Sequence, residues 1–118
     1  MTKVLLVCNK EGAFKSCRAE GHASYAEKGK DIVCAAESFL LRTAIDVLEK
    51  TEGITLKLDK SLHGTLAFCV EEHVFLDNRQ AFLLQERLKC TADFIRMGFK
   101  SLSEEYPEKV QLREISEE

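Results

Sequence analysis

The chain has 118 residues, of which 45% are hydrophobic, so it is long enough and apolar enough to bury one core in a single domain. Its 20 acidic and 17 basic residues give a net charge of −3 without a block of lysine and arginine, which argues against direct binding to nucleic acid. Five cysteines without a CxxC pair argue against a disulfide framework and against a thiolate zinc site.

The first predicted elements form a β-hairpin. Lys3 to Cys8 is a run of β-branched residues and leucine, residues 9–12 have turn chemistry, and Ala13 to Glu20 alternates small or apolar residues with polar ones. The first run is too short for the core of a signal peptide and for a membrane span. We therefore expect a cytoplasmic protein that does not enter a membrane.

The segment from Gly21 to Lys30 fits neither a strand nor a helix. It contains two glycines, a mixture of His, Ser, Tyr, Glu and Lys, and no apolar period, and loops of this kind often carry functional residues. After it, apolar residues recur from Val33 at a spacing of three and four, which predicts a helix from Ile32 to Glu49.

The second half of the chain repeats the pattern of a hairpin followed by a helix. Ile54 to Asp59 and Leu66 to Val70 alternate as paired strands do, and apolar residues keep a helical period from Ala81 to Leu102. Pro107 marks the end of that helix, and Val110 to Leu112 form a short last strand.

The predicted order is therefore ββαββαβ. Each helix has one apolar face and the strands alternate, so the simplest packing places two helices on one face of a mainly antiparallel sheet. The sequence predicts an α+β fold in which residues 1–118 form a single domain.

A candidate nucleophile stands at the start of the first helix. If Asp31 is its N-cap, Cys34 is its third residue, where the helix dipole favours an anion such as a thiolate. His22 lies twelve residues upstream, and the loop is long enough to bring its imidazole back to the thiol as a general base. On spacing alone, Cys34 could instead pack like alanine, and a lone histidine in a loop such as His22 is more often a surface residue than a catalyst.

A resemblance to a known family favours the catalytic alternative. The motif consists of Gly21-His22-Ala23, Gly29, the run Asp31-Ile32-Val33-Cys34-Ala35-Ala36 and Ser38. In residue type and in spacing it resembles the signature of the ribosomal-processing cysteine protease family known as Prp. The hairpin before the motif, the helix after it and the closing segment from Glu104 to Leu112 also resemble the layout of that family.

The resemblance implies a homodimeric bacterial endopeptidase that needs no cofactor and no metal. Its implied substrate is the precursor of protein twenty-seven of the large ribosomal subunit, from which it removes a short N-terminal extension. It implies that His22 and Cys34 form the catalytic dyad. Glu37 departs from the family pattern, which usually has a small or apolar residue there, and a carboxylate facing the thiol would oppose thiolate formation.

Other residues of the motif are candidates for supporting roles. Asp31 either caps the helix or orients His22, and Ser38 lies one turn beyond Cys34 on the same face. Gly21 and Gly29 allow turns or a hinge, and the backbone near Cys34 and Ala35 is the expected oxyanion donor.

Two other interpretations remain open from the residues alone. His63 and His73 lie near acidic neighbours, but two histidines without a third ligand are more typical of surface residues than of a metal site. The alternative to a peptidase is a ribosome-assembly or peptide-binding adaptor without catalytic activity, in which Cys34 is structural.

Overall fold

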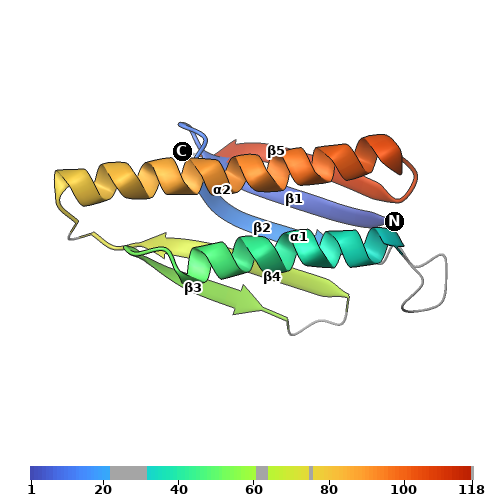
Figure 1. Cartoon of the computed structure of the whole chain (residues 1–118), viewed down its shortest axis with the longest axis horizontal. Helices are drawn as coiled ribbons and strands as arrows, with labels where there is room; N and C mark the ends of the chain where they lie inside the picture. Colours follow the sequence, from blue (N-terminus) through green and yellow to red (C-terminus); the bar gives the residue numbers. More distant parts are fainter. Residues whose placement is uncertain (22–31, 61–63, 75, 118) are drawn as a thin grey trace.

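The computed structural model describes residues 1–21, 32–60, 64–74 and 76–117. Its elements follow the predicted order ββαββαβ (Figure 1). They are β1 (Thr2–Asn9), β2 (Phe14–Glu20), α1 (Ile32–Glu49), β3 (Ile54–Asp59), β4 (Thr65–Glu72), α2 (Asn78–Glu105) and β5 (Val110–Glu117). The bounds of α1 match the prediction, whereas β5 has eight residues and is longer than the short strand that was expected.

The five strands form one sheet in the order β3-β4-β2-β1-β5. The pairs β1–β2, β2–β4 and β3–β4 are antiparallel, and β1–β5 is parallel. The parallel pair follows from the chain path, because β5 comes after the long crossover helix α2. A mainly antiparallel sheet is therefore confirmed, and β3 and β5 are its edges.

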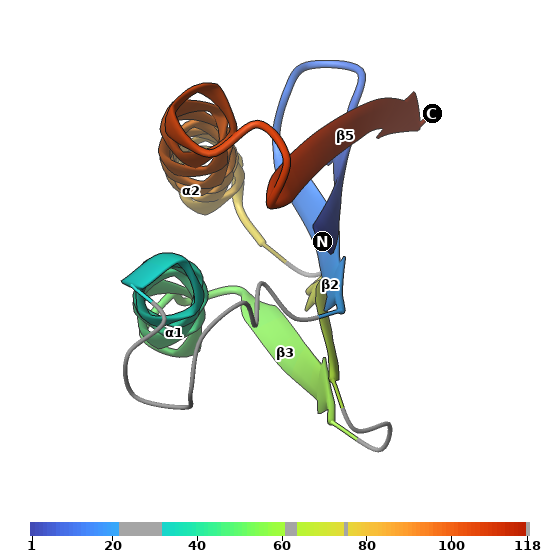
Figure 2. The same cartoon turned by 90° about the vertical axis from the view of Figure 1, so that its right-hand side faces the viewer.

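Both helices lie on the same face of the sheet, side by side and antiparallel to each other (Figures 1 and 2). The core lies between the two layers, as the apolar periods predicted. Its largest fully buried side chains include Phe14, Leu6, Leu48, Leu88 and Phe99. Because the helices are antiparallel, the start of α1 and the end of α2 lie at one end of the molecule.

The helix α2 begins three residues before the first apolar residue of its period. Asp77 is its N-cap: the side chain of Asp77 accepts from the backbone of Gln80, whose own side chain accepts from the backbone of Asp77. This reciprocal pair satisfies backbone donors of the first turn and so extends the helix to Asn78.

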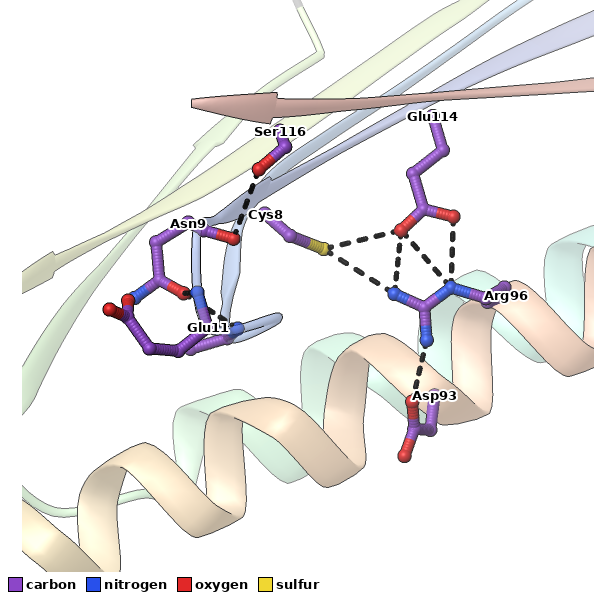
Figure 3. A network of polar contacts seen from close by, with 8 residues as sticks. Cys8, Asn9, Glu11, Asp93, Arg96, Glu114 and Ser116 are labelled. Carbon is purple, nitrogen blue, oxygen red and sulfur yellow. Dashed lines mark hydrogen bonds and ion pairs between the residues drawn. The ribbon is translucent and has the colours of Figure 1, made fainter. Parts of the chain in front are cut away.

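A polar cluster holds α2 against the two neighbouring strands at the β5 edge (Figure 3). Arg96 of α2 makes a bidentate ion pair with Glu114 of β5 at 2.6 and 2.8 Å and a further pair with Asp93. The thiol of Cys8 in β1 lies 3.7 Å from the Arg96 guanidinium. Arg96 lowers the pKa of the Glu114 carboxyl by hydrogen bonding, so the pair is charged near neutral pH.

Candidate active site

Cys34 lies in the first turn of α1, as the third residue of the helix. It is half-buried, while its neighbour Val33 is buried in the core and Ile32 is exposed. The N-terminal N–H groups and the dipole of an α-helix favour negative charge at this position. The helix begins at Ile32, as the apolar period predicted, so Cys34 lies in the first turn as expected.

Cys34 opens into a pocket of about 400 Å³ at the end of the molecule where α1 begins. Four other residues of α1 line this pocket, namely Glu37, Ser38, Leu41 and Arg42. The opposite walls come from the starts of β1 and β4 and from the ends of β2 and β3, with Thr2, Ala19, Gly21, Lys60, Gly64, Thr65 and Leu66. The pocket thus combines apolar side chains, a thiol, two cationic side chains and the carboxylate of Glu37, and this mixed lining suits a peptide segment.

Glu37 lines the same pocket and is only 5% exposed. Its Oε2 accepts a hydrogen bond of 3.0 Å from the hydroxyl of Thr2, which is itself buried. This bond ties the first residue of β1 to the first turns of α1. The residue that departs from the family pattern is therefore part of the site, and its carboxylate shares the pocket with the thiol.

Gly21 closes the same end of the molecule. Its φ of +98° is a conformation that favours glycine, and a Cβ placed on it would lie 2.4 Å from the carbonyl oxygen of Met1. Its N–H donates to the carbonyl of Gly64 at 2.9 Å, which links the end of β2 to the start of β4. This positive φ confirms the turn predicted at Gly21, and Gly21 lines the Cys34 pocket.

The remaining motif residues divide into two groups. Ser38 lines the pocket with Cys34, whereas Ala35 is exposed and does not line it. His22, Gly29 and Asp31 lie outside the described residues. The pairing of His22 with Cys34 and the N-cap role of Asp31 therefore stay predictions.

The other four cysteines lie in different surroundings. Cys8 and Cys17 are buried, and burial raises the pKa of both thiols, that of Cys17 to about 12. Cys69 is half-buried on β4, and Cys90 is exposed in the middle of α2. None of these four lies at the start of a helix, which distinguishes Cys34 from all of them.

Neither a metal centre nor a membrane span is found in the part of the chain that the structure describes. No three His, Cys, Asp or Glu side chains there are grouped to hold a metal ion. The ring of His73 is bonded to the hydroxyl of Thr55 at 3.1 Å, and His63 lies outside the described residues. Within the described ranges, no helix is long and apolar enough to cross a membrane.

Sequence reasoning missed several residues of the pocket wall. Leu41 and Arg42 could have been found, because they follow Cys34 and Ser38 on one helical stripe. Thr2 lies in β1, Lys60 directly follows β3 and Leu66 lies in β4, and no local pattern connects these residues to Cys34.

Comparisons with known proteins identify the family and the fold. The chain matches the family model described as cysteine protease Prp over residues 1–111. A crystal structure of the ribosomal processing protease Prp from S. aureus with a covalently linked product peptide is similar, with 23% identity, a TM-score of 0.72, and 98% of this chain and 100% of that chain covered. The same protease with a substrate peptide has 20% identity, a TM-score of 0.71 and coverage of 98% and 100%.

The structure of SMU.848 from Streptococcus mutans is also similar, with 25% identity and a TM-score of 0.68. The alignment covers 99% of this chain and 96% of that chain. No curated protein matches the chain. The similarity over the full length confirms the fold as a whole.

Proposed function

Since the chain belongs to the cysteine protease Prp family and is a cysteine peptidase, we propose that Cys34 is its nucleophile and His22 its general base. The observation that carries the assignment of Cys34 is its position, in the first turn of α1 and open to a pocket, and the family motif supports that of His22. Residues 1–118 act as one protease domain, because a single core joins both halves of the chain.

The proposed mechanism uses only residues of this chain and water. His22 removes the proton of the Cys34 thiol, and the thiolate attacks the carbonyl carbon of the scissile bond. First-turn N–H groups of α1 stabilise the negative oxygen of the tetrahedral intermediate. His22 returns its proton to the leaving amine, and a water molecule activated by His22 then hydrolyses the thioester and frees Cys34.

The proposed substrate is the N-terminal extension of protein twenty-seven of the large ribosomal subunit in its precursor form. The family resemblance supports it, and the relative from S. aureus is named a ribosomal processing protease and was crystallised with substrate and product peptides. The Cys34 pocket is lined in part by the apolar side chains of Ala19, Leu41 and Leu66, which can accept apolar side chains of a peptide. Removal of this extension would support ribosome assembly in the bacterial cytoplasm, where five free thiols are stable.

A homodimer is the proposed assembly. Large apolar side chains are exposed on the outer surface of α2, among them Phe82, Phe94 and Met97, and exposed apolar groups of this kind often mark protein interfaces. Sedimentation at micromolar concentration would show a dimer, and a monomer under these conditions would contradict this part of the proposal.

The experiment that tests the function is incubation with the ribosomal-protein precursor from the same organism, followed by intact mass spectrometry. We expect one cut within the N-terminal extension by the wild type and none by Cys34→Ala, which keeps volume and helix propensity. Unchanged precursor with the wild type would refute the substrate, and cleavage by Cys34→Ala would refute the nucleophile. Membership of a peptidase family favours this outcome over the non-catalytic adaptor.

A further inference from the structure

A second hollow continues from the Cys34 pocket along the flank of α1. It has a volume of about 590 Å³ and lies between α1 and the end of the edge strand β3. Arg42 and Lys60 line both hollows, so the two are contiguous at these side chains. Together they form one groove that leads from Cys34 toward the end of α1.

The charged side chains of this groove change from positive near Cys34 to negative farther along α1. On α1, Arg42 comes first after Cys34, and Asp46 and Glu49 follow at a helical spacing. Lys60, at the end of β3, adds positive charge on the side near Cys34. All four side chains are exposed, and the salt bridges among the described residues do not include them.

Apolar side chains and a strand edge complete the groove. Phe39 of α1 is 65% exposed and Leu58 of β3 is 42% exposed, and both line it. Because β3 is an edge of the sheet, its outer side can offer backbone groups to an added strand. An extended peptide can use both features, since such a peptide pairs its backbone with a sheet edge and its side chains with neighbouring pockets.

We propose that this groove binds the substrate peptide in an extended form beyond the scissile bond and selects a basic side chain at its far end. The proposal rests on the function proposed for Cys34 and deepens it. The groove continues from the site that holds the nucleophile, so a peptide with its scissile bond at Cys34 leads directly into it. The charges then select an acidic side chain near Arg42 and Lys60 and a basic side chain near Asp46 and Glu49.

The geometry of α1 predicts which residues of the substrate lie near these charges. Arg42 lies about 12 Å from Cys34 along the axis of α1, and Asp46 and Glu49 lie about 18 to 22 Å away, at about 1.5 Å per residue. An extended peptide advances about 3.3 Å per residue, so these distances correspond to about four and about six residues from the scissile bond.

The test is the cleavage of a library of synthetic 16-residue peptides of mixed sequence, read by mass spectrometry. With the wild type, we expect Lys and Arg to be enriched about fivefold at five to seven residues from the cut bond, on one side of it. The double variant Asp46→Lys with Glu49→Lys should reverse this preference to Asp and Glu. Because the groove charges are exposed, 0.5 M NaCl should reduce both preferences.

A matched control changes the net charge equally at exposed positions outside the groove. Glu11→Lys with Glu104→Lys should retain the wild-type preference. Cleavage without any charge preference in the wild type, or an equal change in both double variants, would overturn the groove proposal. If the double variant at Asp46 and Glu49 does not fold, the wild-type profile still decides. A wild type that cuts neither library nor precursor would instead refute the proposed function.

Discussion

Replacement of Gly21 by alanine tests how the pocket end of the molecule is held together. Two costs combine at this position. A residue with a Cβ at φ +98° is strained by about 1–2 kcal/mol. The new Cβ would also lie 2.4 Å from the backbone oxygen of Met1, so the start of β1 must move, which adds about 1–3 kcal/mol as in overpacked cores.

The movement should reach the active site. Met1 precedes Thr2, whose hydroxyl is bonded to Glu37 beside Cys34, and whose N–H donates to the carbonyl of Lys109. We therefore expect Gly21→Ala to reduce the free energy of unfolding by about 3 kcal/mol, and to reduce kcat/KM of the remaining folded protein.

The matched control is Gly12→Ala in the turn between β1 and β2. Gly12 has a φ of +89°, but a Cβ there has nothing within 4 Å, so only the backbone cost applies. Urea unfolding of the two variants should differ by at least about 1 kcal/mol, and only Gly21→Ala should change kcat/KM. Equal losses of stability with unchanged activity in both variants would refute the reasoning.

Three further predictions address single side chains. His22→Ala should abolish turnover with a small change in melting temperature, and a large drop in melting temperature would mark His22 as structural. Because Arg96 lowers the pKa of Glu114, their ion pair stabilises the fold above the pKa of the unfolded carboxyl, and this stabilisation is lost as pH falls below it. The free energy of unfolding of the wild type should therefore fall by up to about 1 kcal/mol relative to Glu114→Gln between pH 5 and 3. Burial raises the pKa of Cys17 from 9.0 to about 12, so above pH 9 this thiol ionises in the unfolded chain but not in the folded one. Urea unfolding should therefore show that the wild type loses stability relative to Cys17→Ala as pH rises from 9. Parallel pH profiles of wild type and variant would contradict either of the last two predictions.

The bounds of α1 were predictable because its apolar period is regular and Gly53 follows its end closely. The length of β5 was not, because six of its eight residues are exposed, so no buried alternation extends beyond Leu112. The strand is defined by parallel pairing with β1 from Val110 to Glu117, which is a contact between distant parts of the chain.

In the candidate site, too, features set by local sequence were predictable and features set by contacts between distant residues were not. The place of Cys34 in a first helical turn followed from local sequence, as did its shared face with Ser38. The burial of Glu37 did not, because an acidic residue in a helix is normally expected to be exposed. Its buried carboxylate accepts from the hydroxyl of Thr2, which stands 35 positions away in the chain.

The most direct test of Cys34 as nucleophile is alkylation with substoichiometric iodoacetamide near neutral pH, with the modified cysteines mapped by peptide mass spectrometry. Residual cleavage of the ribosomal-protein precursor is measured in the same samples. We predict that the fraction of activity lost equals the fraction of Cys34 modified, and that labelling of the exposed Cys90 causes no loss. Activity that does not fall as the alkylated fraction of Cys34 rises would contradict the account.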